Sequence, residues 1–496
     1  MRECQIPVAC VQLRAVDRNA FEERWEHTVA LAASAAERGA RLIVLPEGTV
    51  PGYVLGTQPV SPTQLERGTA SLAAIARRHG TTIVYGGAKI VDDRTFNAAI
   101  ALGPDGRELG FAAKQFLWHF DRLWYAPGET LEPIDTPVGR LGLLVCADGR
   151  IPTIAATLAE RGADMLVMPT AWVTSGRDPG ALENIQADLM VNVRARENGI
   201  PFVACNKAGV ELGAVAYCGK STIIDAQGQT QARAGERDEE ILLGNVRIGF
   251  DGGVGRMQRA AETPDELELT AAPSASDRAV RTPDRLRIAF TSERQRERLT
   301  RFSHFAAQAD ADLLVAAGEG RPGGGDTGTA CVPILLVPPS EHGRAQLIES
   351  RGLQIALVDD VVLHDPRGLV ALRAAGIDVI LWQTHDSPEW QVRFARTRAA
   401  ELRAYVVVFS FEEARAFVVD PDGAVIAGTF ADYQLASFTY DRSRTQATLV
   451  APSTDVAQGL RVAERLRRAT MPSEPIRARE RYAGGLAEPL ADSSER

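Results

Sequence analysis

The chain repeats one order of strand-like and helix-like segments in its two halves. Residues 139–172 run from an apolar strand through a helical pattern to a second strand, and residues 353–386 follow the same order. Such alternation predicts α/β folding with parallel strands. Two unrelated α/β domains would also look alike at this level, but five segments in one shared order favour duplication of a whole domain. The other recurring pairs are residues 6–13 and 285–292, 40–48 and 311–320, 196–207 and 400–411, and 221–235 and 416–430.

Domain boundaries follow from the places where this pattern stops. The chain has 496 residues, which is enough for at least two domains. Residues 251–284 are rich in Gly, Pro, Ala and polar residues without sustained apolar periodicity, and we interpret them as a linker. We therefore predict a first domain over residues 1–250, a second over residues 285–470 and a C-terminal extension over residues 471–496.

Composition excludes several classes of protein. The net charge of −9 disfavours nucleic-acid binding, because phosphate contacts need a basic face. No apolar run approaches the roughly 20 residues of a membrane span, and the N-terminus does not have the pattern of a secretory signal. The six cysteines are scattered without a Cys-x-x-Cys pair, which disfavours a disulfide framework or a zinc site. We expect a cytoplasmic protein with no nucleic-acid or membrane partner, no cofactor and no metal.

Three chemically active side chains follow apolar strand segments of the first half. Glu47 follows "LIVLP", Lys114 follows "LGFAA" and Cys146 follows "GLLV". Strand ends of α/β folds hold side chains rigidly where ligands bind. A thiol can attack a carbonyl-like carbon, a carboxylate can take the thiol proton and later activate water, and an ammonium can stabilise the oxyanion. The sequence therefore predicts nucleophilic catalysis by Cys146 with Glu47 as general base and Lys114 as oxyanion stabiliser.

The surroundings of these residues lead to further expectations. Taken alone, Cys146 could be a core thiol, Lys114 a surface lysine and Glu47 a cap. A helix that opens at Pro152 would favour the Cys146 thiolate through its positive N-terminal end. The backbone N–H of Ala147 could share the oxyanion with Lys114. Partial burial at an apolar strand end should raise the pKa of the Glu47 carboxyl group.

The three motifs together resemble the nitrilase superfamily of carbon–nitrogen hydrolases. They are "LPEG", "AAKQF" and "CADGRIP", and the similarity extends over roughly residues 5–250 through Asn97, "MPTAW", "RARENG", Asn206 and "GKSTIIDAQG". The resemblance implies an α-β-β-α sandwich, a Glu–Lys–Cys triad and hydrolysis of a non-peptide carbon–nitrogen bond through a thioester. The expected substrate is a small amide or N-carbamoyl compound, with nitrile hydrolysis or amide-forming acyl transfer as alternatives.

One residue departs from the family pattern, and several neighbours remain candidates for the pocket. Many members carry a second glutamate between the Lys and Cys motifs, where this chain has Asp121 in "WHFDRLWYAPG". Asp121 could hold Lys114 or orient the substrate, or it could simply pair with Arg122. We also expect Trp172 and His119 to bind substrate with Asp121 and Ala147. Asp148 and Arg150 are interpreted as an ion pair that holds the Cys146 segment, with the alternative that either lines the pocket.

The second half lacks the same set of reactive groups. Glu319 lies near the place of Glu47, but Asp359 or Asp360 stands where the thiol would be. No lysine follows Lys220, and Cys331 falls too early in the repeat. We predict a degenerate, noncatalytic copy. Members of the nitrilase superfamily, which this chain resembles, commonly pair two sandwich domains. The resemblance therefore implies that the copy forms an internal pseudo-dimer with the first half and supplies one wall of the pocket. Further homo-oligomers are possible.

Two other classes of function stay open at this point. A Cys–His hydrolase could use Cys146 with His119. A noncatalytic binding or scaffold protein could be built from two inactive sandwiches, although retention of all three reactive groups in one half disfavours it.

Overall fold

The computed structural model describes residues 3–57, 59–174, 180–249, 269–271, 284–292, 296–317, 332–337, 340, 342–410, 415–431 and 434–469. Most of the predicted linker, the whole predicted extension over 471–496, Glu319 and Cys331 lie outside these residues. One described part of the predicted linker, Leu269–Ala271, forms strand β15 and pairs in parallel with β19 (Ala345–Ser350). That piece of the segment therefore belongs to a sheet of the second half.

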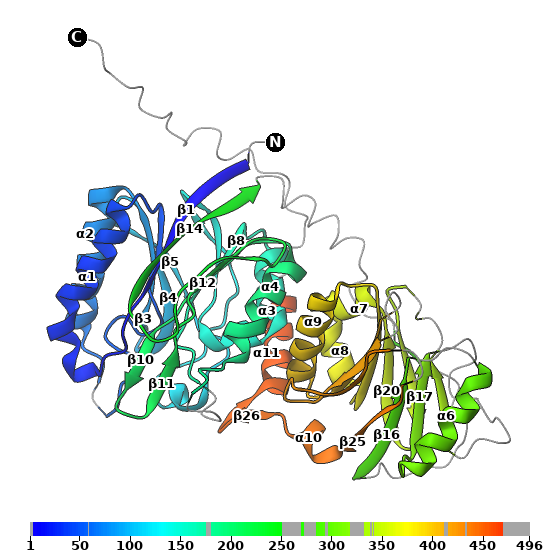
Figure 1. Ribbon diagram of the computed structural model, residues 1–496. Helices are drawn as coiled ribbons and strands as arrows, with labels where there is room; N and C mark the ends of the chain where they lie inside the picture. Colours follow the sequence, from blue (N-terminus) through cyan, green and yellow to red (C-terminus); the bar gives the residue numbers. More distant parts are fainter. Residues whose placement is uncertain are drawn as a thin grey trace.

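The first half of the chain is an α-β-β-α sandwich, as predicted (Figure 1). The first sheet contains, in spatial order, β14 (Glu240–Gly249), β1 (Glu3–Gln12), β2 (Leu42–Val44), β3 (Thr82–Val91), β4 (Arg94–Leu102) and β5 (Glu108–Ala113). The second contains β13 (Thr230–Arg233), β12 (Thr222–Ile224), β9 (Phe202–Cys205), β8 (Met165–Pro169), β7 (Gly139–Leu143) and β6 (Ile134–Thr136). The covering helices are α1 (Phe21–Glu37) and α2 (Pro62–His79) on the first sheet, and α3 (Pro152–Glu160) and α4 (Val191–Asn198) on the second.

Smaller elements complete this sandwich. A separate hairpin pairs β10 (Ala208–Glu211) with β11 (Val215–Cys218). Four short helical turns lie in the connections, at Arg18–Ala20, His119–Leu123, Cys146–Arg150 and Gln186–Met190. The turn at Gln186–Met190 is π-helical and continues directly into α4.

The side chains of β1 show how the layers form. Val8 and Cys10 lie in the core between the two sheets, whereas Ala9 and Val11 pack under α1 and α2. Neighbouring side chains of a strand point to opposite faces, so a strand buried on both faces needs a continuous apolar run. The pairs β1–β2, β2–β3, β7–β8 and β8–β9 are all parallel. Parallel pairing brings the carboxyl ends of β2 and β3, and those of β7 and β8, to common edges.

The larger sheet of the second half repeats the strand order of the second sheet of the first half, with β15 added at one edge, whereas the smaller sheet has four described strands and not six. The larger sheet contains β15, β19, β20 (Leu353–Val358), β21 (Val379–Thr384), β22 (Tyr405–Ser410), β23 (Arg415–Val419) and β24 (Val425–Thr429). The smaller sheet contains β18 (Ile334–Val337), β17 (Leu313–Ala317), β16 (Arg285–Thr291) and β25 (Ala436–Asp441). The order β24 to β19 matches β13, β12, β9, β8, β7, β6 in position and in parallel or antiparallel sense. Duplication stays a prediction, and this shared order supports it.

Helices cover both sheets of the second half as well. The helix α6 (Arg296–Gln308) packs on β16 and β17, while α7 (Asp360–His364), α8 (Gly368–Ala374) and α9 (Pro388–Leu402) pack on the larger sheet. The remaining elements follow β25 and are α10 (Arg442–Gln446), β26 (Leu449–Ala451), β27 (Thr454–Asp455) and α11 (Val456–Ala469).

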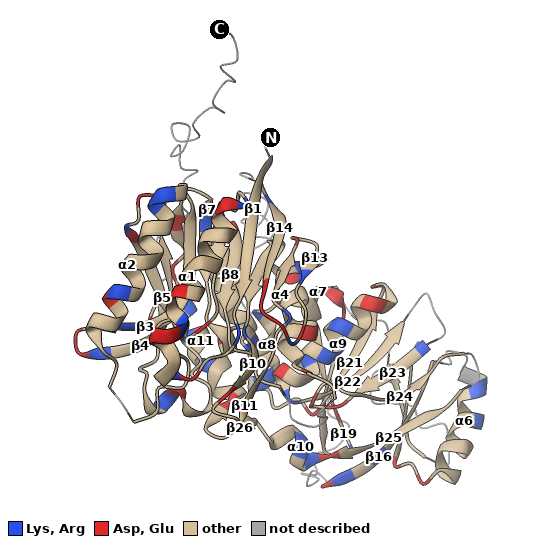
Figure 2. Ribbon diagram, turned by 60° about the vertical axis from the view of Figure 1, so that its left-hand side comes forward, with Lys and Arg blue, Asp and Glu red and all other residues tan. Residues whose placement is uncertain are grey.

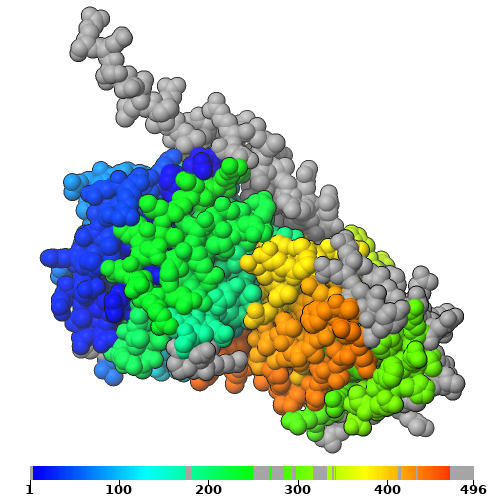
Figure 3. All heavy atoms as spheres, in the orientation of Figure 1, coloured from blue at the N-terminus to red at the C-terminus, as the bar shows by residue number. Residues whose placement is uncertain are grey.

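The two halves meet through helices (Figures 1 and 3). The last helix, α11, lies between them and contacts α3 of the first half and α8 and α9 of the second, while α4 contacts α9. On the outer side, charged residues of both signs lie on α1 and α2 (Figure 2), as expected for solvent-facing helix surfaces. Among the described residues, no helix has the length and apolar character to cross a membrane.

A buried glycine of α11 allows the close contact between the halves. A Cβ atom at Gly459 would lie 2.6 Å from the Ile151 Cδ1 atom and 2.8 Å from the Phe116 ring. We expect Gly459→Leu to lower the free energy of unfolding by about 1–3 kcal/mol, because overpacking forces neighbours off their rotamers. Urea unfolding checks this. Gln458→Leu, on the exposed side of the same helix, should change stability by less than about 0.5 kcal/mol, and equal effects would contradict the packing argument.

Candidate active site

The structure brings the three predicted reactive side chains to one place. Glu47 follows β2, Lys114 directly follows β5, and Cys146 follows β7. The Glu47 backbone N–H donates to the Thr170 carbonyl oxygen at 3.2 Å, which joins the strand ends of the two sheets. Cys146 interacts electrostatically with both Glu47 and Lys114. The predicted set of acid, ammonium and thiol therefore lies at a common edge of the sandwich.

One oxygen of the Glu47 carboxylate is left without a partner. Oε1 accepts hydrogen bonds from Lys114 Nζ at 2.8 Å and from Asn97 Nδ2 at 2.7 Å. Oε2 is buried and has no hydrogen-bond partner, and the whole residue is 0% exposed. Buried carboxylate oxygens are normally satisfied. Oε2 is therefore the atom of Glu47 that is free to accept a proton.

Lys114 lies between two carboxylates. Its Nζ atom is 2.6 Å from Asp121 Oδ2 and 2.8 Å from Glu47 Oε1, and all three side chains are 0% exposed. Burial alone would lower the pKa of Lys114, but the charges of Asp121 and Glu47 raise it well above its ordinary value. The ammonium therefore stays charged. Asp121 does not pair with Arg122, whose Nε donates to the Ser453 carbonyl oxygen at 3.1 Å.

Cys146 begins a tight turn with unusual backbone geometry. Its φ of +47° lies in the left-handed region, which non-glycine residues rarely adopt without support from their surroundings. Asp148 supplies such support. Its carboxylate accepts backbone N–H groups from Val145 at 3.1 Å, Gln115 at 3.0 Å and Phe116 at 2.7 Å. These bonds tie the Cys146 turn to the residues that follow Lys114.

The expectation of a stabilised Cys146 thiolate is wrong. The helix α3 does open at Pro152, but burial, followed by the negative charge of Glu47, raises the pKa of the Cys146 thiol to about 12. The positive charge of Lys114 lowers it without offsetting these effects. The thiol is therefore neutral near pH 7, and a base must remove its proton when it reacts.

A cavity of about 890 Å³ opens beside Cys146 and is lined by both halves of the chain. Two of the predicted substrate-binding residues, Ala147 and Trp172, line it. The Trp172 backbone N–H donates to Asn206 Oδ1 at 2.7 Å, while its buried indole N–H has no partner. The second half contributes eight of the lining residues: Arg396, Ala400, Arg403, Asp422, Gly423, Ala424, Leu449 and Val450.

Of two expectations about neighbouring residues, the role of His119 stays a prediction and the ion pair of Asp148 with Arg150 is wrong. His119 is not among the described residues that line the cavity. Its backbone N–H donates to Thr454 Oγ1 at 2.7 Å, and its ring packs edge-on against Phe120. Asp148 and Arg150 do not form the predicted ion pair, because Asp148 binds backbone N–H groups instead. The Arg150 guanidinium lies over the Trp118 ring, 5.2 Å from its centroid.

Some residues of the active site and its cavity could not be identified from the sequence. The buried Tyr53 ring lies 5.8 Å from Lys114 Nζ, where a cation–π contact favours the ammonium. Tyr53 lies in the connection between β2 and α2, in a stretch whose path no local pattern predicts. The lining residues from the second half also had no local signal, because they approach the cavity only through packing between the halves.

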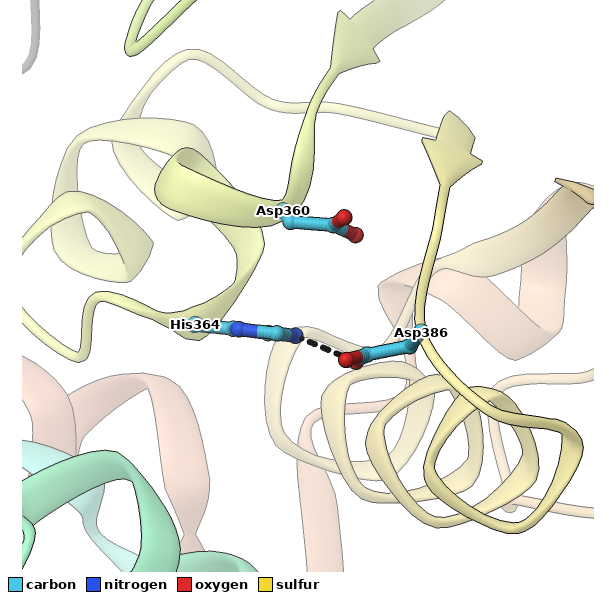
Figure 4. A group of neighbouring side chains, drawn as sticks. All are labelled: Asp360, His364 and Asp386. Carbon is cyan, nitrogen blue, oxygen red and sulfur yellow. Dashed lines mark ion pairs between the residues drawn. The ribbon is translucent and has the colours of Figure 1, made fainter. Parts of the chain in front are cut away.

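The second half carries different chemistry at the place that corresponds to the Cys146 turn. Asp360, His364 and Asp386 come together there (Figure 4), with one possible ligand atom from each within 4.8 Å of the others. Both oxygens of Asp360 already accept hydrogen bonds, from Trp382 Nε1 at 3.0 Å and from the His385 N–H at 3.1 Å. His364 Nε2 lies 2.8 Å from Asp386 Oδ2. We interpret the group as an ion-pair cluster.

Comparisons with known proteins concern the first half. The sequence profile described as "Carbon-nitrogen hydrolase" matches residues 7–249. A Pseudomonas protegens protein named "Hydrolase in pqqF 5'region" is 32% identical over 226 residues, 44% of this chain and 75% of that protein. A nitrilase of Pyrococcus abyssi is 29% identical over 224 residues, 44% of this chain and 81% of that protein. A solved amidase from Nesterenkonia sp. matches with TM-score 0.45 and 26% identity, over 53% of this chain and 97% of that chain.

The neutral Cys146 thiol leads to a prediction about its reactivity. We expect Glu47→Gln to slow alkylation of Cys146 by iodoacetamide at pH 7 at least tenfold, because the variant lacks the proton acceptor, and general bases typically contribute about 10²–10⁴-fold. Between pH 7 and 9 the rate in this variant should rise about tenfold per pH unit, as expected below a raised thiol pKa. Intact-mass time courses measure both rates, with Cys146→Ala identifying the site. A pH-independent rate in Glu47→Gln would contradict a neutral thiol.

Proposed function

Because the chain belongs to the carbon–nitrogen hydrolase family, we propose that it hydrolyses a small amide or N-carbamoyl compound through a thioester on Cys146. The observation that carries the proposal is the single unpartnered oxygen of Glu47 in a site where Lys114 is charged and the Cys146 thiol is neutral. A neutral thiol becomes a nucleophile only when a nearby base takes its proton.

The proposed reaction has two halves. Glu47 Oε2 accepts the thiol proton as Cys146 Sγ attacks the amide carbon. The oxyanion that forms is stabilised by the Lys114 ammonium and the Ala147 backbone N–H. The C–N bond then breaks as Glu47 returns the proton to the leaving nitrogen, which departs as ammonia or an amine. Water next gives a proton to Glu47 and attacks the thioester. The C–S bond then breaks as Glu47 returns this proton to the sulfur, which releases the acid and restores the thiol.

Asp121 takes the role that a second glutamate has in many family members. Although its side chain is one methylene shorter, Asp121 Oδ2 lies 2.6 Å from Lys114 Nζ. The peptide around it brings the carboxylate close enough, since Oδ2 also accepts the Trp118 backbone N–H at 2.9 Å. We propose that Asp121 holds Lys114 in its charged form and directs the ammonium toward the oxyanion.

Related reactions would use the same three groups. A nitrile could be attacked by Cys146, and an amine could replace water and give a new amide. The similar proteins include both a nitrilase and an amidase by name, so these names do not choose between them. The N–H donors of Lys114 and Ala147 match the oxyanion of an amide adduct, but they would serve the anion of a nitrile adduct as well, so the choice between these reactions rests on the substrates that are turned over.

The cavity suggests the kind of amide that would bind. The Nε atom of Arg150 is buried without a hydrogen-bond partner, and no carboxylate among the described residues pairs with its guanidinium group. Burial lowers the pKa of Arg150 to about 10, so the group remains charged near pH 7. Arg150 is only partly exposed, toward the cavity, and the charge of Glu401 acts on it without forming an ion pair. A partly desolvated cation of this kind favours an anionic ligand. We therefore propose that the substrate carries a carboxylate that pairs with Arg150.

We propose that the second half is a noncatalytic copy which forms an internal pseudo-dimer with the first. The shared strand order supports this, as do the cavity residues that it contributes. Asp359, at the place of the thiol, accepts backbone N–H groups from Val362 and Gly343 and so has a structural role. In the proposed reaction, the second half of the chain closes the outer side of the cavity.

The triad is tested with primary amides and N-carbamoyl compounds. We expect an acyl adduct on Cys146 by intact mass and release of ammonia, both absent in Cys146→Ala. Lys114→Met should lower kcat by about 10²–10³-fold, which is typical for loss of an oxyanion donor. Lys89→Met is the matched control, since Lys89 pairs with Glu108 away from the cavity. Wild-type turnover by Lys114→Met would exclude the proposed role of Lys114.

The substrate carboxylate is tested by comparing a monoamide of a dicarboxylic acid with a neutral amide of equal length. Arg150→Met should raise KM for the acidic substrate about 10–100-fold, because hydrogen bonds to charged groups contribute about 1.5–3 kcal/mol. KM for the neutral amide should change less than about threefold, and Arg150→Lys should recover part of the loss. Steady-state kinetics measures the difference. Equal losses on both substrates would argue against the pairing.

A further inference from the structure

A closed ring of four charged side chains lies at the contact between α4 and α9. Arg194 and Glu197 come from α4, and Arg398 and Glu401 come from α9. Arg194 donates to Glu197 at 2.8 Å and to Glu401, and Arg398 donates to Glu197 at 2.5 Å and to Glu401 at 2.8 Å. All four side chains are at most 1% exposed. Each half therefore supplies one arginine and one glutamate to a buried, charge-balanced group.

The two arginines also make matching bonds to turns of their own halves. Arg194 Nε donates to the Gly149 carbonyl oxygen at 3.0 Å, and its Nη2 donates to that of Arg150 at 3.3 Å. Arg398 Nε donates to the Leu363 carbonyl oxygen at 2.7 Å, and its Nη2 lies 3.4 Å from that of His364. The first turn carries Cys146, whereas the second carries neither a thiol nor a lysine.

We propose that Arg194, which Glu401 of the second half holds in place, positions the Cys146 turn, so that the noncatalytic half of the chain helps to orient the nucleophile of the other half. The inference rests on the proposed function of Cys146 and adds a role for Arg194 that acts through the turn. Arg194 is a positioning residue, because it contacts the backbone of the turn and not the reacting atoms. The direction of the Arg194 side chain is set in part by its bond to Glu401, which belongs to the second half.

The geometry of the turn explains why such support matters. Cys146 has a φ of +47°, and a strained conformation persists only when its surroundings hold it. Asp148 holds the backbone N–H groups of the turn and of the residues after Lys114. Arg194 holds the carbonyl groups at the other end of the turn. Together they fix the turn from both sides, and only the second of these supports depends on the other half of the chain.

A simple adhesive role for the ring makes a different prediction. Buried ion pairs often contribute little net stability compared with apolar packing, whereas removal of one partner leaves buried charge and destabilises the fold. If the ring only joined the halves, Arg194 and Arg398 would be equivalent, since each donates to both glutamates. If it positions the nucleophile, only Arg194 should matter strongly for Cys146, because only Arg194 contacts its turn.

The experiment therefore compares Arg194→Met with Arg398→Met in the full-length chain. We expect similar decreases in Tm, but alkylation of Cys146 by iodoacetamide should fall at least tenfold in Arg194→Met and less than threefold in Arg398→Met. In Arg194→Met, kcat for a neutral amide should fall by about the same factor as the alkylation rate, while KM stays nearly constant. Equal alkylation rates in the two variants, or an unchanged rate in Arg194→Met, would overturn the proposal.

Two features keep the result decisive. If either methionine variant does not fold, the pair Arg194→Lys and Arg398→Lys replaces it, because lysine keeps the positive charge but cannot donate to a glutamate and to both carbonyl groups at once. Alkylation also does not require amide turnover. Failure of the proposed function would therefore appear as missing acyl adducts on a normally alkylated Cys146, while failure of this inference would appear as equal alkylation in the matched variants.

Discussion

The burial of Lys114 between Glu47 and Asp121 is the constraint on which the rest of the site depends. An ammonium without access to water needs negative charge close by, and this chain supplies two carboxylates within 2.8 Å of it. One positive and two negative charges leave the group with excess negative charge, and that excess helps to keep the Cys146 thiol protonated. The same arrangement leaves Glu47 Oε2 unsatisfied. Burial thus produces both an unreactive thiol at rest and the base that can activate it.

A group of buried charges like this one can form only where the backbone holds each side chain in place against the repulsion between like charges. The ends of β2 and β7 provide this, because strands that are buried at these ends cannot shift without exposing apolar side chains. Lys114 follows the edge strand β5, and its backbone N–H is held by the Asn97 carbonyl oxygen at 2.8 Å. The two sheets are linked at this edge by the bond from the Glu47 N–H to the Thr170 carbonyl oxygen. Rigidity of the sandwich is therefore part of the chemistry, since it holds charges in place that would separate in a flexible loop.

The sequence predicted those parts of the site that depend on local pattern. Glu47, Lys114 and Cys146 were identifiable because each follows an apolar run, and Asp121 because it fills a family position. The pKa of Cys146 was mispredicted because the helix N-terminus is visible in the sequence, whereas the depth of burial and the distance to Glu47 are not. Likewise, the partners of His119 and Asp148 depend on packing between distant segments. The ring of Arg194, Glu197, Arg398 and Glu401 involves residues about 200 positions apart, and no local pattern could pair them.

Covalent fusion of the two halves has a physical consequence for such a site. Separate subunits would assemble the wall of the cavity only at concentrations above their dissociation constant, whereas a tether makes the contact intramolecular. Fusion also removes the requirement that both halves be identical. The first half can keep Lys114 and Cys146 while the second replaces them and presents Arg396 and Leu449 to the same cavity. Under the proposed duplication, a half without reactive groups of its own is free to change the shape of the pocket, provided that α9 keeps the two charges which complete the ring with α4.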